Sequence, residues 1–155
     1  MMFVKCLKEA VLLASLVLSA SAWSQAAPPP TPTSVAGAKV ITVEEGRTLA
    51  EGKSAQFYDT RTVLNFGKGH VPGAASIAYK EESDKVEAFD ASKDQFDMSK
   101  LPADKSSRVV FYSDGPTGWK SYKAAVLASK AGYKDVLYMR GGFAEWTDRK
   151  FPVER

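Results

Sequence analysis

Short apolar runs alternate with helix-like patterns from residue 38 to near the end of the chain. The segment RVVFY at residues 108–112 is the clearest candidate for a buried strand, because it is rich in β-branched and aromatic residues. Similar but weaker runs occur before and after it. The predicted strands are residues 40–43, 56–60, 74–78, 108–112 and 136–139.

Residues 120–131 have the pattern of an amphipathic helix, and Gly132 follows at a position where helices commonly end. An earlier helix is expected to begin after Thr42, a good N-cap residue, and to continue to about Glu51. The apolar face of the helix at 120–131 consists of Ala124, Ala125, Leu127, Ala128 and Ala131.

Three further segments have less regular patterns. Residues 62–66 are expected to form a helical turn closed by Gly67, and residues 142–148 a closing helix. Residues 80–106 are polar, and we interpret them as a long connection with one helical turn over 90–96.

The alternation of strands and helices predicts an α/β domain with a parallel sheet that is covered on both faces. In such folds, ligands bind beyond the carboxyl ends of the strands. That edge is expected to carry Asp59 and Arg61, the loop 113–119, and Arg140.

The first 22 residues are typical of a secretory signal peptide. Lys5 and Lys8 precede an apolar run from Ala10 to Leu18, and Ala20-Ser21-Ala22 offers small residues for cleavage. The run has only about nine residues, too few to cross a bilayer roughly 30 Å thick. We therefore expect residues 1–22 to be removed and the protein to be periplasmic or secreted, without a membrane span after cleavage.

Residues 23–37 include three consecutive prolines and small polar residues. Such a segment favours an extended, solvated tether, so we interpret it as a Pro-rich linker. The single globular domain is then residues 38–155, and the length of 155 residues fits one domain.

Composition excludes several classes of function. With 21 Lys and Arg against 18 Asp and Glu, the net charge of +3 is too small for a nucleic-acid-binding surface. The one cysteine, Cys6, lies in the predicted signal peptide, so the mature chain would have no thiol for a disulfide, a zinc site or a persulfide. We expect neither a metal nor a cofactor.

The order of motifs over residues 56–150 resembles the rhodanese-like family, in its secreted single-domain form. Residues 57–79 look like its strand, short helix, Gly-His-x-Pro-Gly-Ala turn and following strand. Residues 109–146 look like its active-site strand, loop, helix, last strand and Gly-Gly-x-x-x-Trp ending. The resemblance implies a three-layer α/β fold with a central five-stranded parallel sheet.

In active members of this family, a cysteine follows the active-site strand and accepts a sulfane sulfur from a donor such as thiosulfate. Ser113 stands at that position here, while Lys120-Ser121 matches a basic-Ser pair of the family. Secreted relatives carry a second cysteine directly before Trp, where this chain has Gly118. The resemblance therefore implies the family fold without its thiol.

The loop has two interpretations. Its glycines and the following helix N-terminus favour an anion pocket to which Lys120 adds charge, although the Asp114 carboxylate opposes it. The alternative is a plain tight loop whose N–H groups bond water and nearby carbonyls. The candidate anion-binding residues are Ser113, Asp114, Gly115, Thr117, Gly118, Trp119, Lys120 and Ser121.

The remaining candidates are supporting residues. Asp59 and Arg61 are expected to brace neighbouring loops, and Arg140 to reach the loop or cap a carbonyl. We interpret the only histidine, His70, as structural, which leaves Ser113 without a base for nucleophilic catalysis. Trp119 is expected to pack in the interior, with exposure in the loop as the alternative.

The sequence thus predicts an exported rhodanese-like protein that lacks sulfurtransferase activity and has a binding or accessory role. Its partner would be a periplasmic protein or a small anion, and its oligomeric state is left open. The alternative is a sulfurtransferase-type enzyme acting on thiosulfate or a persulfide carrier.

Overall fold

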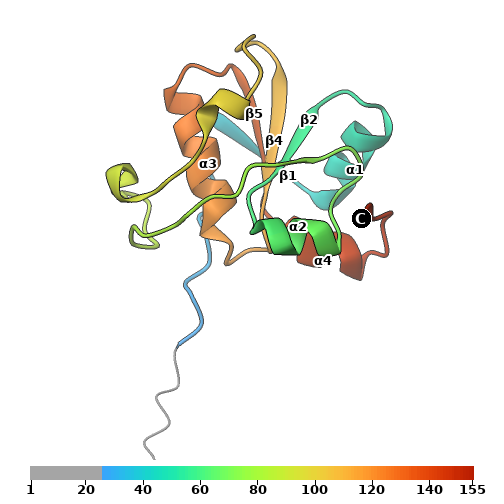
Figure 1. Cartoon of the computed structure of the whole chain (residues 1–155), viewed down its shortest axis with the longest axis horizontal. Helices are drawn as coiled ribbons and strands as arrows, with labels where there is room; N and C mark the ends of the chain where they lie inside the picture. The colour runs from blue at the N-terminus through green and yellow to red at the C-terminus, as the bar shows by residue number, and fades with distance from the viewer. Residues whose placement is uncertain (1–25) are drawn as a thin grey trace, which may run out of the picture.

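The computed structural model describes residues 26–155, which form a three-layer α/β domain around one sheet (Figure 1). The strand order is β1-β5-β4-β2-β3, and all neighbouring strands are parallel. The predicted five-stranded parallel sheet is confirmed, while the predicted signal peptide lies outside the described residues. The strands are β1 (Ala38–Ile41), β2 (Gln56–Asp59), β3 (Ala75–Ser76), β4 (Arg108–Tyr112) and β5 (Asp135–Met139).

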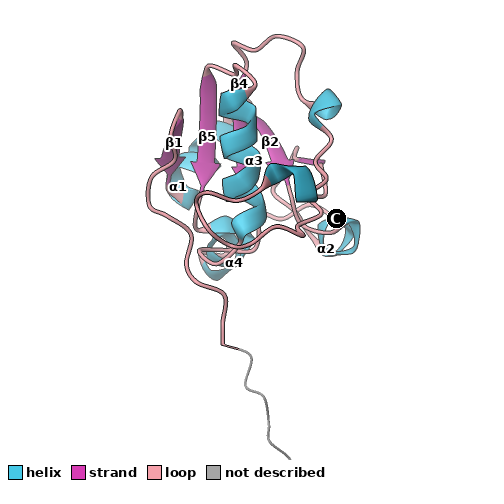
Figure 2. Cartoon of the chain, turned by 90° about the vertical axis from the view of Figure 1, so that its left-hand side faces the viewer, coloured by secondary structure: helices cyan, strands magenta, loops and turns pink. Residues whose placement is uncertain are grey.

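Helices cover both faces of the sheet because side chains alternate between the faces along each strand. In β4, Val109 and Phe111 pack with α3 (Trp119–Lys130), whereas Val110 and Tyr112 pack on the opposite side with α1 (Val43–Glu51) and α4 (Gly142–Asp148). Figure 2 shows α3 in front of the sheet with α1 and α4 behind it. No helix in residues 26–155 has the length and apolar character needed to span a membrane.

Several element boundaries differ from those expected. β1 ends before Thr42, because Thr42 caps α1 through a hydrogen bond from the Glu45 N–H, and Val43 becomes the first residue of the helix. The third strand has two paired residues rather than five. The helix between β2 and β3, α2 (Val63–Lys68), continues through Gly67, and Gly69 is its C-cap.

The connection over residues 80–106 contains two 3₁₀ turns, Ala91–Lys93 and Met98–Lys100, rather than one helical turn over 90–96. Each turn follows an aspartate that caps it: Asp90 accepts a hydrogen bond from the Ser92 N–H, and Asp97 accepts one from the Ser99 N–H. Local side-chain capping therefore orders parts of a segment that shows no hydrophobic period.

A buried ammonium group attaches this connection to α3. The side chain of Lys123 is 0% exposed, and its Nζ lies 2.9 Å from Glu81 Oε2 and donates to Ser83 Oγ at 2.8 Å. Asp94 Oδ2 accepts hydrogen bonds from the hydroxyls of Tyr79 at 2.7 Å and Ser83 at 2.6 Å. Because a buried charge is tolerated only when it is paired and hydrogen-bonded, this cluster fixes the position of the connection.

The Asp94 carboxylate makes this cluster sensitive to acid. Burial raises the pKa of Asp94, but hydrogen bonds from Ser83 and Tyr79 outweigh burial and lower the pKa to about 2. Since the folded pKa lies below the unfolded value, the stabilisation is complete above about pH 4 and is lost as the pH falls toward 2. We expect Asp94→Asn to lower the free energy of unfolding by about 2 kcal/mol at pH 7, measured by urea denaturation.

Asp97→Asn is the matched control, because Asp97 is exposed and its carboxylate accepts hydrogen bonds only from Ser99 within the described chain. Asp97→Asn should change the free energy of unfolding little, both at pH 7 and at about pH 2.5. Equal effects of the two substitutions, or an Asp94→Asn effect of the same size at about pH 2.5, would contradict this account of the cluster.

Candidate functional site

The candidate site lies at the carboxyl edge of the sheet, where the central strand β4 ends. Ser113 follows β4 directly, and the loop continues to Gly118, the N-cap of α3. Ser113 is 1% exposed, and its Oγ has no hydrogen-bond partner within residues 26–155. In the part of the chain that the structure describes, no side-chain hydrogen bond caps the N-terminus of α3, and the first N–H groups of the helix point toward the loop.

The first half of the loop is held by α4. The carbonyl oxygen of Ser113 accepts a hydrogen bond from the Phe143 N–H at 2.8 Å, and that of Asp114 accepts one from the Ala144 N–H at 2.8 Å. Gly142 permits this close approach: it has φ +62°, and a Cβ there would lie 2.7 Å from Gly115 N. The backbone of α4 therefore packs directly on the loop.

The second half of the loop is a four-residue turn, closed by a hydrogen bond from the Gly118 N–H to the Gly115 carbonyl at 2.8 Å. Pro116 is the second residue of the turn, where its fixed φ is favourable. Because a trans peptide points its C=O and N–H in opposite directions, each N–H points away from the group that holds the preceding carbonyl. Within the described chain, the N–H groups of Asp114, Gly115 and Thr117 have no protein acceptor.

Charges near the loop are unevenly paired. Asp114 is exposed, as an outward-turned carboxylate would be. Lys120, in the first turn of α3, is partly buried and forms no ion pair within residues 26–155. Ser121 is 1% exposed and donates to the Gly118 carbonyl at 3.3 Å. The local balance therefore favours an anion over a cation.

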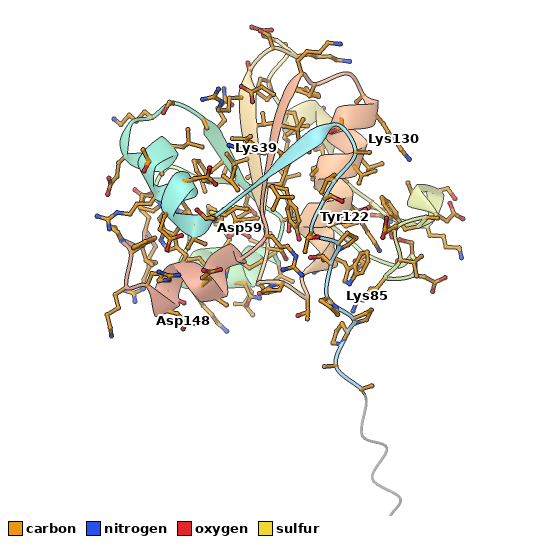
Figure 3. All side chains as sticks on the ribbon, turned by 180° about the vertical axis from the view of Figure 1, so that it is seen from behind. Lys39, Asp59, Lys85, Tyr122, Lys130 and Asp148 are labelled. Atoms are coloured by element: carbon orange, nitrogen blue, oxygen red, sulfur yellow. The ribbon has the colours of Figure 1, made fainter. Side chains whose placement is uncertain are left out.

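Asp59 and Arg61 form a buried ion pair just after β2. Arg61 Nη2 lies 2.6 Å from Asp59 Oδ2 and also donates to the Gly69 carbonyl at 2.6 Å. Burial alone would lower the pKa of Arg61, but the Asp59 carboxylate raises it, so the guanidinium stays charged. The structure thus places this pair as a brace between two loops; Figure 3 shows Asp59 in the interior, whereas Asp148 lies at the periphery.

His70 lies in a separate cluster. Its Nδ1 is 3.0 Å from the Phe66 carbonyl oxygen, its Nε2 is 3.6 Å from Glu154, and its ring stacks on Phe66. Since Ser113 Oγ has no hydrogen-bond partner, the described residues contain no Ser–His pair that could activate a serine nucleophile.

The structure also shows contacts that the sequence did not indicate. The segment before β1, interpreted as a solvated linker, reaches the loop: Thr31 is 2% exposed and donates from its N–H to the Pro116 carbonyl at 2.7 Å. Trp119 is 4% exposed and donates from Nε1 to the Pro29 carbonyl. Arg140 was expected to reach the loop or cap a carbonyl, and its Nη2 donates to the Thr31 carbonyl at 2.8 Å. A Trp and an Arg flanking the loop, each needing an acceptor, were the only signals for this contact.

We also searched the described residues for cavities and for groups of metal-ligating side chains. A cavity of about 510 Å³ lies elsewhere, against the start of β2; its lining includes Lys53, Phe57, Pro72 and Glu154. Residues 26–155 contain no group of three or more His, Cys, Asp or Glu side chains placed to hold a metal ion.

A family model for the rhodanese-like domain matches residues 42–149, well over half of the chain. The chain belongs to the rhodanese-like domain family. The match includes the loop 113–119 and the strands β2 to β5, but it begins after β1 and after the segment that contains Thr31.

Individual relatives agree with this assignment. The thiosulfate:glutathione sulfurtransferase of Homo sapiens is 24% identical over 116 residues, which is 75% of this chain and 99% of that protein. The uncharacterized protein YibN of Escherichia coli strain K12 is 27% identical over 118 residues, 76% of this chain and 73% of that protein. The BH2092 protein of Bacillus halodurans has the same fold, with a TM-score of 0.59 and 18% identity over 76% of this chain and 77% of that chain.

Gly142→Ala tests the packing of α4 on the loop. A Cβ at this residue would lie 2.7 Å from Gly115 N and 2.7 Å from Ser113 O, and φ is +62°. Because backbone atoms cannot move aside as a flexible side chain would, we expect a loss of about 2–4 kcal/mol in the free energy of unfolding. Thermal unfolding followed by circular dichroism measures it.

Gly67→Ala serves as the control. Gly67 lies in α2 and has no positive φ, and within the described chain a Cβ at this residue would meet no heavy atom within 4 Å. That substitution should be neutral or slightly stabilising. A Gly142→Ala protein as stable as Gly67→Ala would show that α4 does not hold the loop in this way.

Proposed function

We propose that this chain is a rhodanese-like module without sulfurtransferase activity, whose loop 113–119 binds a small anion or an acidic group of a partner protein. The observation that carries the proposal is Ser113, which follows β4 where active family members have cysteine. Ser113 is buried, its Oγ has no hydrogen-bond partner within residues 26–155, and no cysteine occurs after Cys6.

Serine cannot take over the family reaction. A persulfide forms when a thiolate attacks sulfur and later leaves, and a hydroxyl group is ionised far less readily than a thiol. The oxygen of serine also gives no stable carrier for a sulfane sulfur. The loss of the thiol therefore removes the covalent step while leaving the loop that surrounds it.

Support for anion binding comes from the donors in and beside the loop. The N–H groups of Asp114, Gly115 and Thr117 lack protein acceptors, and the uncapped N-terminus of α3 contributes a partial positive charge. Lys120 adds a full charge without an ion-pair partner in the described chain. The carboxylate of Asp114 is exposed and can remain in water.

A second candidate function is a sulfurtransferase that uses a thiol supplied by its substrate. The likeness to the human thiosulfate:glutathione sulfurtransferase favours it. In this case a thiol acceptor would have to attack the donor directly, and the loop would only position the anionic sulfur donor.

We expect purified protein to form no thiocyanate from thiosulfate and cyanide, whereas Ser113→Cys in a Cys6→Ser background should accept sulfur. Its thiolate would attack the sulfane sulfur of thiosulfate, the S–S bond would break, and sulfite would leave with the bonding electrons. Loop donors and Lys120 should lower the thiol pKa by about one unit from about 8.5. Thiol titration and a mass gain of one sulfur are the measurements.

Ser34→Cys in the same background is the control, because Ser34 is exposed and its side chain forms no hydrogen bond in the structure. Its thiol should titrate near 8.5. Thiocyanate turnover near 1 s⁻¹ by the unsubstituted protein, a rate typical of enzymes, would overturn the non-catalytic assignment. An unshifted pKa in Ser113→Cys, with no persulfide, would contradict the anion-binding loop.

The proposal places the protein in the periplasm or outside the cell, where it would act as a binding or accessory component. Its support is the signal-like sequence of residues 1–22, which lies outside the described residues. We expect N-terminal sequencing of exported protein to begin between Trp23 and Pro28. Recovery of soluble cytoplasmic protein that still begins at Met1 would contradict export.

A further inference from the structure

The segment Pro29–Thr31, which we call the strap, crosses from the N-terminal arm to the loop. It lies outside the family match, which begins at residue 42. In Figure 1 the N-terminal segment leaves the domain beside the end of α3 that adjoins the loop. Residues 26–30 are exposed, so burial of apolar surface does not hold the strap in place. Its attachment is polar.

Thr31 is the centre of this attachment. Its N–H and its Oγ1 both donate to the Pro116 carbonyl, at 2.7 and 2.9 Å. A hydroxyl has one proton, so Oγ1 must accept its 2.8 Å hydrogen bond from the Tyr138 hydroxyl. Burial raises the pKa of Tyr138, which keeps this hydroxyl protonated as a donor. A directed chain therefore runs from Tyr138 through Thr31 to Pro116.

Two further donors hold the strap backbone. Arg140 binds the Thr31 carbonyl through Nη2 at 2.8 Å and Nε at 3.2 Å, and Trp119 Nε1 donates to the Pro29 carbonyl at 2.8 Å. Prolines suit this role, because their φ is fixed before docking and an extended proline-rich backbone leaves its carbonyls free. The ordering of the strap therefore costs less conformational entropy than that of an ordinary segment.

The contact falls on the peptide group that decides the direction of one loop donor. Pro116 and Thr117 are the two central residues of the turn closed by Gly115 and Gly118. The central peptide of such a turn can rotate between turn types, which reverses its C=O and N–H. Two bonds from Thr31 hold the Pro116 carbonyl on the strap side, so the Thr117 N–H points to the opposite side.

We propose that Thr31 is a positioning residue of the loop 113–119, acting through the Pro116 carbonyl to aim the Thr117 N–H at the anion site. The importance of that N–H rests on the proposed function, but the ordering of the turn by the strap does not. Thr31, Arg140 and Trp119 thus form a latch on the loop, and α4 holds its other half.

Backbone hydrogen exchange of the otherwise unsubstituted full chain, measured by NMR, tests the latch. In Thr31→Val, which removes the hydroxyl at nearly constant shape, we expect protection of the Gly118 amide to fall about tenfold. The Phe143 and Ala144 amides, which hold the other half of the loop, should keep their protection. Thr31→Ser retains the hydroxyl and should restore the Gly118 value.

Thr33→Val is the matched control, because Thr33 is exposed in the same segment and forms no side-chain hydrogen bond in the structure. Equal Gly118 protection in Thr31→Val and Thr33→Val would overturn the latch, as would a uniform loss of protection over the whole domain. If Thr31→Val does not fold, Arg140→Gln tests the same prediction, since it removes only the bonds to the Thr31 carbonyl.

The thiol of Ser113→Cys, in the Cys6→Ser background, separates this proposal from the proposed function. If both are correct, adding Thr31→Val raises the thiol pKa back toward 8.5, and adding Thr33→Val does not. A Gly118 amide that depends on Thr31, together with a thiol that is unshifted in every background, would retain the latch and reject the anion site.

Discussion

The arrangement of the site depends on the carbonyl groups of four successive residues. Those of Ser113 and Asp114 are held by α4, that of Gly115 by the turn itself, and that of Pro116 by Thr31. Peptide planarity then fixes where the intervening N–H groups point. The fold thus shapes an array of donors without using any of them as its own structural bonds. An enzyme with a thiolate and a module that binds an anion need the same array.

Much of the fold could be predicted because its determinants are local or periodic. RVVFY forms β4 as expected, and the closing helix covers residues 142–148 as predicted. Thr42 and the acidic residues after it define the start of α1 by chemistry that depends on near neighbours. The differences are mostly at the ends of elements: Val43 is β-branched, which favours a strand, but the Thr42 cap makes it the first residue of α1.

Two features could not be predicted, and both depend on polar contacts between distant parts of the chain. The local pattern of α3 gives no sign of partners for Lys123, yet the connection over residues 80–106 brings Glu81 and Asp94 to it. The prolines before Thr31 are typical of a linker and are exposed, but Thr31 and Val35, which the predicted linker also included, are buried. The contact with Pro116 exists only because the C-terminal ends of β4 and β5 lie side by side in the sheet.

The sequence located the candidate loop, but it did not show whether the N–H groups of the loop are paired. The sequence left a choice between an anion pocket and a plain tight loop whose N–H groups bond water and nearby carbonyls. Within the described chain the turn uses the Gly118 N–H, whereas the Thr117 N–H has no protein acceptor, so nearby carbonyls do not pair with every donor of the loop.

A buried hydroxyl without a partner, as at Ser113, costs about 1–3 kcal/mol that a self-contained loop would avoid. Under the proposed function, an anion in the loop would accept hydrogen bonds from this hydroxyl and from the open N–H groups. Because the bonds from α4 and Thr31 hold the loop carbonyls, the N–H groups of the same peptides stay directed away from them.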